Sequence, residues 1–434
     1  MTKFNRRSFL QLTGAAAVTG AAVMSAPSIA RAAGKKVVIV GGGPAGATVA
    51  NYLRMMDMSI EVTLIEADKN YFTCFMSNEV LGGKRSMDGI KQGYMGLEKA
   101  GVKVVHDMVT GIDGAKKKVM TKGGQTFEYD RCVVAPGVDF KFDKYDGLDA
   151  NVAETKIPHA WKAGPQTALL RKQLEEMKDG GTFTMVAPPN PFRCPPGPYE
   201  RVSLIANYFK KEKPKSKILI IDHKDKFSKQ GLFTQAWKKF YGYGTDNSMI
   251  EWIKGSDAGQ IEGVDVAGMA VKTDFEEYKG DVINFIPAQK AGPIAFAAGL
   301  TDASGWCPVD KVTFESKQVP GIHVLGDAAI ATKMPKSGYA ANSQGKVTAA
   351  AIAAALNGKT VGVPSYVNTC YSIAADDWAF SVAAVYKYDK EKDIIAGVKG
   401  AGGLSPMDAS AEDRKREVAY AHSWYDNICK DIWG

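Results

Sequence analysis

Apolar residues fall into short runs that alternate with helical patterns along most of the chain. A β-branched run at residues 36–40 predicts a buried strand. A glycine-rich turn, a helix at residues 47–56 and a strand at residues 60–66 are expected after it. Further strands are expected near residues 102–109 and at residues 131–135. This alternation of strand and helix predicts an α/β fold built on a parallel sheet.

The same alternation starts again after residue 151 and predicts a second α/β unit. Its expected elements are a helix at residues 166–178, a strand at 182–187, a helix at 199–210, a strand at 217–221 and a helix at 233–241. We find no internal repeat beyond these two α/β halves.

The later part of the chain predicts a return to the first sheet and then a third, smaller unit. A strand at residues 322–325 and an alanine-rich helix ending near residue 355 indicate the return, and Pro364 and Ser365 mark the boundary that follows. The predicted fold class is α/β, with two Rossmann-like three-layer dinucleotide-binding domains and a small α+β C-terminal domain. The predicted boundaries are residues 33–150 and 281–360 for the first domain, 151–280 for the second and 361–434 for the third.

The turn after the first strand fits the dinucleotide-binding pattern G-x-G-x-x-G. Its residues are Gly41, Gly42, Gly43, Pro44, Ala45 and Gly46. Gly41 makes the turn, Gly43 lets the backbone approach a pyrophosphate, and Gly46 lets the helix pack on the strand. Glu66 ends the next strand, 20 residues after Gly46, where a carboxylate can hold ribose hydroxyls. We therefore expect a dinucleotide at this turn, with its phosphates at the helix N-terminus.

Two other strand ends favour FAD over NAD as this dinucleotide. One strand ends in a tight turn that contains Ala135 and Gly137. Another delivers Gly326 and Asp327 beside the start of a helix, where the carboxylate suits a ribitol hydroxyl of a flavin. Each segment alone could be a plain buried strand with a turn. Together, and in this order, they resemble the FAD domain of the pyridine-nucleotide disulfide oxidoreductases.

The second α/β unit lacks a corresponding glycine motif. Its first strand, at residues 182–187, leads into a loop rich in proline. The prolines are Pro188, Pro189, Pro191, Pro195, Pro196 and Pro198. Each of them removes a backbone N–H donor and fixes φ, so this loop cannot wrap a pyrophosphate and hydride exchange with nicotinamide is not expected. The stiff loop would instead hold Cys194 in one place.

Composition and charge add information mainly at the N-terminus. The chain has 434 residues and a formal net charge of +8, which is too dispersed to indicate nucleic-acid binding. Residues 5–11 contain the twin-arginine pair Arg6 and Arg7, a weakly apolar stretch follows, and residues 30–32 offer a small-x-small cleavage site. The alternative is an incidental arginine pair before an apolar helix. We predict a twin-arginine signal peptide at residues 1–32, export to the periplasm and no integral membrane anchor.

The cysteines and histidines exclude several metal and haem chemistries. The six cysteines are Cys74, Cys132, Cys194, Cys307, Cys370 and Cys429. None forms a C-x-x-C pair, so the chain has neither a haem c attachment site nor a thioredoxin-type motif. The five histidines are scattered without ligand spacing, and no metal site is predicted.

Three of these cysteines lie in motifs with a specific family resemblance. Cys74 lies in the sequence YFTCFMSNE, Cys194 in the proline-rich loop followed by Glu200, and Cys370 in the sequence NTCY. In these motifs the chain resembles the flavoprotein subunit of flavocytochrome c sulfide dehydrogenase, a family related to sulfide:quinone oxidoreductase. The resemblance covers essentially the whole chain after the predicted signal peptide.

The resemblance implies a role for each of these residues. Cys74 matches the cysteine that binds the flavin covalently, and Cys194 and Cys370 match the redox-active disulfide. Glu200 matches a base near that disulfide, and Trp424 matches an aromatic residue packed near the flavin. Structural alternatives remain for each: a buried thiol for Cys74, a purely structural disulfide, a helix-capping role for Glu200, and simple core packing or a subunit interface for Trp424.

The implied activity is a periplasmic sulfide dehydrogenase. Sulfide would be oxidised to sulfur or polysulfide, and the electrons would pass to a c-type cytochrome subunit that carries the haem. The turn at Gly338 and Tyr339 opens a helix whose positive end could stabilise the anionic reduced flavin. One alternative is an accessory redox flavoprotein of a sulfur-oxidising complex. Another is a sulfide:quinone oxidoreductase, which we rank low because charged residues surround most of the helix expected at residues 411–433.

Overall fold

Five parallel strands form the first sheet, in the order β19-β9-β1-β2-β5, in a computed structural model that describes residues 34–434. The strands are β1 (Lys36–Val40), β2 (Glu61–Ile65), β5 (Lys103–Val105), β9 (Arg131–Val134) and β19 (Ile322–Val324). The central strands β1 and β9 and the edge strand β19 bury almost all of their side chains. Such burial is typical of a parallel sheet that is covered on both faces.

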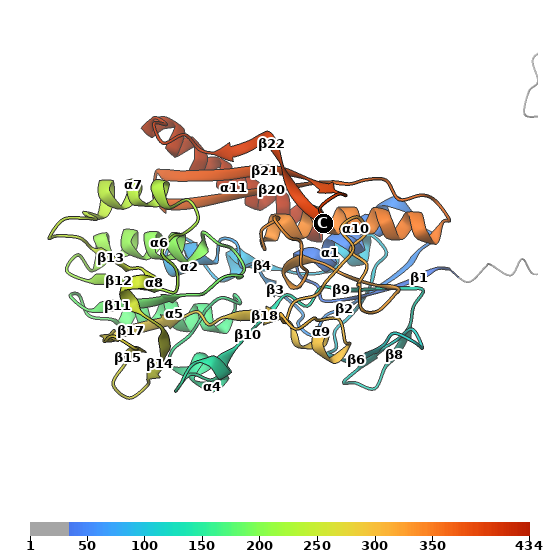
Figure 1. The fold of residues 1–434 in the computed structure, drawn as a ribbon, viewed down its shortest axis with the longest axis horizontal. Coiled ribbons are helices and arrows are strands. Elements are labelled where there is room, and N and C mark those ends of the chain that lie inside the picture. The colour runs from blue at the N-terminus through green and yellow to red at the C-terminus, as the bar shows by residue number, and fades with distance from the viewer. Residues whose placement is uncertain (1–33) are drawn as a thin grey trace, which may run out of the picture. The chain divides into compact units, whose positions relative to one another are not determined.

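Helices α1 (Pro44–Met56) and α10 (Gly338–Leu356) lie side by side along this sheet (Figure 1). They approach closely because Gly345 of α10 has no side chain where it meets Thr48 of α1: a Cβ there would lie 2.8 Å from the Thr48 Cβ. A small antiparallel sheet adds Ile112 and Val119 to the same core. Its strands are β6 (Val109–Asp113), β7 (Lys118–Thr121) and β8 (Thr126–Glu128).

The second sheet has four parallel strands in the order β13-β12-β11-β17. They are β11 (Thr182–Ala187), β12 (Lys217–Asp222), β13 (Ile250–Ile253) and β17 (Val282–Phe285). The helices of this domain are α5 (Pro165–Glu176), α6 (Gly197–Glu212) and α7 (Gln230–Tyr241). A further small sheet contains β14 (Ile261–Asp265), β15 (Ala270–Thr273) and β16 (Glu277–Lys279).

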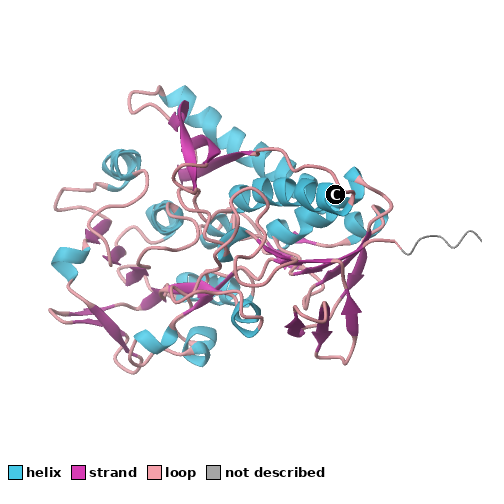
Figure 2. Cartoon of the chain, turned by 45° about the vertical axis from the view of Figure 1, so that its right-hand side comes forward, coloured by secondary structure: helices cyan, strands magenta, loops and turns pink. Residues whose placement is uncertain are grey.

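The C-terminal part is a three-stranded antiparallel sheet followed by one long helix. Its strands, in the order β20-β21-β22, are β20 (Ser365–Ala375), β21 (Trp378–Asp389) and β22 (Ile394–Leu404), and the helix is α11 (Ala411–Trp433). The predicted fold class, two parallel α/β domains with a smaller C-terminal α+β domain, is confirmed. Figure 2 shows many of the connecting loops gathered between the helices near the centre of the molecule.

The remaining described elements are short. They are β3 (Tyr71–Phe72), α2 (Ser77–Leu81), β4 (Lys91–Gln92), α3 (Met95–Lys99), β10 (Val138–Phe140), α4 (Ala150–Thr155), α8 (Gly255–Ala258), β18 (Gln289–Ala291) and α9 (Pro293–Ala297), with 3₁₀ turns at Asp88–Ile90, Phe142–Lys144 and Gly326–Ala328.

The structure corrects the boundary that we expected at residue 281. Strand β17 follows that residue, but it pairs with β11 and completes the second sheet. The chain returns to the first domain only after β17, through β18, which pairs with β10 between the two larger sheets (Figure 1). The expectation was wrong because a short buried strand carries no sequence signal of which sheet it joins.

Several element ends also differ from the expected ones. Helix α1 begins at Pro44 rather than residue 47, because proline suits the first helical position. The strand expected at residues 102–109 is shorter, and the β6-β7-β8 sheet that follows it was not predicted. Among residues 34–434, no helix has the length and apolar character needed to cross a membrane. The predicted signal peptide lies outside the described residues.

Candidate functional site

The glycine turn presents backbone where any side chain would collide. Gly41 has φ +100° and its N–H donates to Ile65 O at 2.9 Å. A Cβ on Gly41 would strike Ala135 O, and one on Gly46 would strike Gly41 O. Gly43 precedes α1, whose first turn contains Pro44 and Ala45 and no acidic residue. The positive end of α1 is therefore open to an anion.

Glu66 lies at the same edge of the first sheet, where β2 ends. Its Oε2 accepts a hydrogen bond from Gly42 N at 2.7 Å, and its Oε1 accepts one from Asp68 N at 3.2 Å. The carboxylate thus lies against the glycine turn, in the place where a ribose is held in dinucleotide-binding domains.

Asp327 supplies an unused hydrogen-bond acceptor at the end of β19. Its Oδ1 is buried and has no hydrogen-bond partner within residues 34–434, while Oδ2 lies 3.9 Å from Arg193 Nη1. Gly326, with φ +75°, makes the turn that delivers it, and burial raises the pKa of Asp327. Buried polar atoms are almost always hydrogen-bonded, so Oδ1 fits a ligand hydroxyl such as that of a ribityl chain. Gly137, with φ +63°, lies in the neighbouring turn after β9.

A cavity brings together seven of the predicted site residues, from all three domains. Its lining includes Cys74, Cys194, Glu200, Gly338, Tyr339, Cys370 and Trp424. The glycine turn, Glu66 and Asp327 are not part of this lining. The cavity therefore gathers the residues expected at the reacting end of a flavin and not those expected at its ribityl chain, pyrophosphate and ribose.

Cys194 and Cys370 contact each other in this cavity. Cys194 follows β11 and has φ +59°, and its N–H donates to Lys336 O at 2.7 Å. Cys370 lies in β20. The structure describes both as thiols rather than as a disulfide, so their oxidised pairing stays a prediction. A hydrogen bond from Cys194, assisted by the charge of Lys229, lowers the pKa of Cys370. The same hydrogen bond raises the pKa of Cys194.

Glu200 is bound from two other elements and does not cap its own helix. Its Oε1 accepts from Ile373 N of β20 at 3.0 Å, and its Oε2 accepts from Asn78 Nδ2 of α2 at 2.8 Å. Burial raises the pKa of Glu200 to about 7. A carboxyl group with this pKa can exchange a proton near neutral pH.

Cys74 lies in a tight turn between β3 and α2. Met76 in this turn has φ +66°, and Ser77 Oγ donates to Cys74 O at 2.7 Å. Burial raises the pKa of the Cys74 thiol. The turn therefore has a fixed conformation, with Cys74 facing the cavity.

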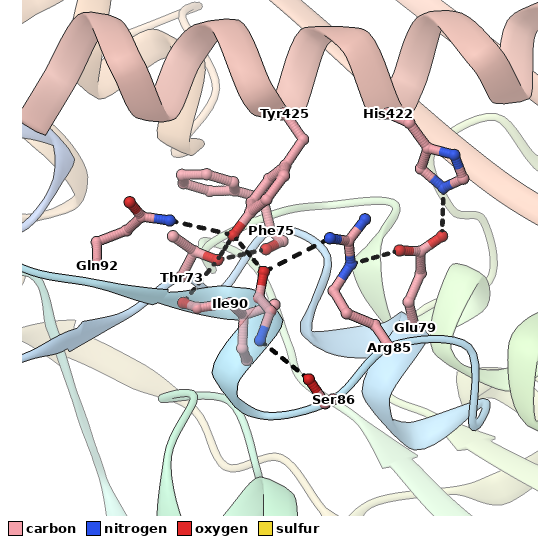
Figure 3. Close-up of polar contacts among 10 residues, drawn as sticks. Thr73, Phe75, Glu79, Arg85, Ser86, Ile90, Gln92, His422 and Tyr425 are labelled. Carbon is pink, nitrogen blue, oxygen red and sulfur yellow. Dashed lines mark hydrogen bonds and ion pairs between the residues drawn. The ribbon is translucent and has the colours of Figure 1, made fainter. Parts of the chain in front are cut away.

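Helix α11 holds the segment around Cys74 through polar contacts (Figure 3). Tyr425 OH donates to Gly89 O at 3.0 Å and lies 3.2 Å from Thr73 Oγ1. Glu79 is bound by His422 Nε2 at 2.6 Å and by Arg85 Nε at 2.8 Å. These contacts connect the last helix to residues 73–89, the segment that contains Cys74 and α2, and they were not predicted from the sequence.

Aromatic side chains close the cavity on the α11 side. The ring of Trp424 meets Phe75 edge to face, with centroids 5.6 Å apart, and stacks near Tyr339 at 6.3 Å. The Trp424 Nε1 atom is buried and finds no hydrogen-bond partner in the part of the chain that the structure describes. Gly338 and Tyr339 begin α10, which is capped by Ser337 through a hydrogen bond from Ala340 N at 3.1 Å. Trp424 thus contacts the cavity rather than packing only in the core.

Two buried cations near the cysteine pair were not predicted. Arg201 is 1% exposed, and its guanidinium donates to Asn78, Asn284 and two backbone carbonyls. Lys229 is 6% exposed and donates to Cys370 O and Ser372 Oγ. Their positions in the sequence resemble those of ordinary surface cations, so only the packing reveals them. Within residues 34–434 no cluster of His, Cys, Asp and Glu could hold a metal.

Three family models match successive parts of the chain. Residues 35–169 match "Pyridine nucleotide-disulphide oxidoreductase", residues 167–287 match the central part of "Sulfide dehydrogenase [flavocytochrome c] flavoprotein chain", and residues 363–433 match "Flavocytochrome c sulphide dehydrogenase, flavin-binding". A sulfide dehydrogenase flavoprotein chain from Chlorobaculum thiosulfatiphilum is 54% identical over 46 residues, covering 11% of this chain and 96% of that sequence. The chain belongs to this family of sulfide-oxidising flavoproteins.

More distant relatives of this sulfide-oxidising flavoprotein span most of its length. The mitochondrial sulfide:quinone oxidoreductase of Dictyostelium discoideum is 24% identical over 379 residues, which cover 82% of this chain and 81% of that protein. The mouse enzyme of the same name is 22% identical over 314 residues, covering 70% and 67%. The structure of the Aquifex aeolicus sulfide:quinone oxidoreductase superposes with a TM-score of 0.71 at 15% identity, covering 92% of each chain, which shows a shared fold.

Proposed function

We propose that this chain is a sulfide dehydrogenase that oxidises sulfide to sulfur or polysulfide through a redox-active disulfide between Cys194 and Cys370. The observation that carries the proposal is the contact of these two thiols in the same cavity as Cys74 and Glu200. Two cysteines from different domains lie together beside a carboxyl group, which favours a reactive site over a purely structural disulfide.

The first step is thiol–disulfide exchange with the hydrosulfide ion. Its sulfur attacks Sγ of Cys194, a new S–S bond forms, and the bond between Cys194 and Cys370 breaks. Cys194 then holds a persulfide, and Cys370 leaves as a thiolate. The hydrogen of the hydrosulfide ion stays on the persulfide, and its negative charge passes to Cys370. A second hydrosulfide ion takes the outer sulfur as hydrodisulfide and leaves Cys194 as a thiol.

The residues of the first domain would hold FAD. Gly41, Gly43 and Gly46 suit its pyrophosphate, Glu66 its ribose, and Asp327 its ribityl chain, and we propose that Cys74 binds it covalently. Bound FAD would supply the two-electron acceptor that the dithiol needs to return to a disulfide.

Glu200 is the proton carrier of the proposed cycle. Because the pKa of Glu200 is raised to about 7 by burial, its carboxylate can accept the proton of the Cys194 thiol when the disulfide forms again. The hydrogen bonds from Ile373 N and Asn78 Nδ2 keep the carboxyl group in place.

We infer that the electron acceptor is a c-type cytochrome, bound as a partner subunit that carries the haem. Two matched family models carry the name of a flavocytochrome. Helix α11 buries its apolar residues Tyr425, Ile428 and Ile432 against the rest of the chain, which leaves no large apolar face for a membrane surface. A quinone acceptor is the second candidate, because the relatives that match most of the chain bear that name. The proposed location is the periplasm, reached through the twin-arginine box.

The test is an anaerobic titration of the flavin-loaded protein with sulfide, followed by flavin absorbance. We expect bleaching with about one sulfide per flavin, which Cys194→Ser abolishes and Cys429→Ser leaves intact. Adding oxidised cytochrome c or a short-chain quinone to the reduced protein then identifies the acceptor. A wild-type flavin that stays oxidised would contradict the proposal and favour an accessory redox role within a larger sulfur-oxidising complex.

A further inference from the structure

Lys229 is a buried lysine bound to the strand that carries Cys370. Its Nζ donates to Cys370 O at 2.7 Å and to Ser372 Oγ at 3.0 Å. The residue is 6% exposed and precedes helix α7 with φ +59°. Its position is therefore fixed both by an unusual backbone conformation and by two hydrogen bonds.

Lys229 has no carboxylate counter-ion in the described part of the chain. The nearby buried Lys224 differs, because its Nζ lies 2.6 Å from Asp222 Oδ1. Burying an ammonium group without a paired anion is costly. We therefore expect that an anion near Lys229 offsets this cost in at least one state of the site.

Two carboxyl groups and two thiols act on Lys229, and within the described residues neither carboxyl group forms an ion pair with it. Glu200 of α6 is engaged by Ile373 N and Asn78 Nδ2. On α11, Glu417 Oε1 accepts from Ser405 Oγ at 2.6 Å and from Ser381 Oγ at 3.3 Å, and its buried Oε2 has no hydrogen-bond partner among the described residues. Arg201 is a cation and donates only to neutral acceptors. Cys194 and Cys370 are the other ionisable groups that act on Lys229.

Of the two sulfurs, Cys370 is the better placed to carry the negative charge. Lys229 donates to the carbonyl of that same residue, and its charge acts to lower the pKa of the Cys370 thiol. Cys194, by contrast, lies near the end of the loop that leads to α6, and Lys229 donates its two hydrogen bonds to other residues; the charge of Glu200 acts on both thiols.

We propose that Lys229 is a positioning residue that stabilises the Cys370 thiolate and thereby directs the attack of hydrosulfide to Cys194. The inference rests on the proposed function. When hydrosulfide forms its bond with the Cys194 sulfur and the bond to Cys370 breaks, the negative charge passes to the residue whose carbonyl Lys229 binds. Attack on Cys370 would instead release a thiolate at Cys194, which is not one of the two residues that Lys229 binds.

The first measurement is the pH dependence of iodoacetamide labelling at Cys370 in the reduced, flavin-loaded protein, read by peptide mass spectrometry. Removal of an adjacent cation raises a thiol pKa by about one unit or more. In Lys229→Met and Lys229→Gln, iodoacetamide should therefore label Cys370 about tenfold more slowly below neutral pH.

The control variants separate the charge of Lys229 from its role in folding. Gln keeps a donor for the backbone carbonyl and guards against loss of folding. Lys229→Arg should restore the labelling rate, and Lys238→Met, an exposed change on the same helix, should not alter it.

The second measurement locates the persulfide after one equivalent of sulfide. In the wild type we expect it on Cys194, and in Lys229→Gln we expect it divided between both cysteines. Unchanged labelling and an unchanged persulfide position in both neutral variants would overturn the role of Lys229 and leave the proposed function intact. If sulfide does not bleach the wild-type flavin, the proposed function fails, while a labelling profile that depends on Lys229 would still support the stabilised thiolate.

Discussion

The two larger domains share one architecture but end their first strand in opposite ways. In the first, β1 leads through glycines into α1, whose first turn has no acidic residue. In the second, β11 leads through prolines into α6, whose first turn contains Glu200. An acidic group at a helix N-terminus repels a phosphate. The same position in the fold therefore suits an anion in one domain and holds Cys194 and the proposed proton carrier in the other.

The second strands of the two sheets show the same contrast. Glu66 follows β2 and accepts hydrogen bonds only from backbone N–H groups. Asp222 ends β12 and is fully buried, bound by Tyr199 OH at 2.5 Å, Trp252 Nε1 at 3.1 Å and Lys224 Nζ at 2.6 Å. Hydrogen-bond donors of the protein thus already occupy the carboxylate of Asp222, which lies where a nucleotide-binding domain would hold a ribose. The second domain retains the fold of a nucleotide-binding domain and fills the nucleotide position with its own side chains.

The largest effect is expected at the glycine turn. Gly46→Val would place a branched side chain against Gly41 O, so we expect complete loss of bound FAD. Gly93→Ala is the matched control, because a Cβ there has no neighbour within 4 Å. Flavin absorbance per purified chain measures both. Full flavin content in Gly46→Val would show that this turn does not bind the dinucleotide.

The next largest effect is expected at Glu200, in the first turn of α6. Glu200→Gln removes the proposed base, and loss of a general base costs about 10²–10⁴ in rate. Because the pKa of Glu200 is about 7 in the folded protein, the advantage of the wild type should grow as pH rises through 7. The ratio of the two reduction rates measures this, since the ionisation of sulfide is common to both proteins. A ratio that does not vary with pH would exclude Glu200 as the base.

The same raised pKa predicts a pH dependence of stability. The unfolded chain loses this proton near its ordinary value of 4.5, and the folded chain loses it only near 7. The protonated form is therefore favoured in the fold, and wild-type stability relative to Glu200→Gln should fall as pH rises from 4.5 to 7. Thermal unfolding of both proteins across this interval checks the sign, and a difference that increases in the opposite direction would contradict the raised pKa.

A smaller effect is expected at the buried Asp222 carboxylate of the second domain. Tyr199→Phe removes one donor from the buried Asp222 carboxylate and should lower the free energy of unfolding by about 1–3 kcal/mol. Tyr208→Phe on the same helix removes a hydroxyl that makes no hydrogen bond within the described residues and should change this free energy by less than about 0.5 kcal/mol. Chemical denaturation measures both. Equal stability of the two variants would mean that Tyr199 does not satisfy Asp222.

The smallest effect is expected at the contact between α11 and the first domain. Tyr425→Phe removes the hydroxyl that meets Gly89 O and Thr73 Oγ1 and should lower stability by about 1 kcal/mol. Tyr420→Phe, on the exposed side of α11, is the control. A second readout is the fraction of flavin that remains on the chain after acid denaturation, which should fall in Tyr425→Phe if the contact positions Cys74.

Much of the fold was predictable because its signals are local. The alternation of apolar strands and helices, the glycine turn and the proline loop depend on neighbouring residues, and the structure has an element at nearly every expected place. The boundary at residue 281 was not predictable. Strand β17 has the same apolar pattern as a strand of either sheet, and only its pairing with β11 assigns it.

The sequence by itself determined where backbone conformation is constrained and which residues are reactive. Gly41, Gly46 and the proline loop fix local geometry, and the motifs around the three cysteines marked them as a set. The tertiary structure alone decided which groups surround them. Lys229 and Arg201 appear in the sequence as ordinary cations, and their effect on the cysteines arises from burial and from contacts between distant segments. Electrostatic effects depend on distance and on exclusion of water, and neither is encoded at a single position in the chain.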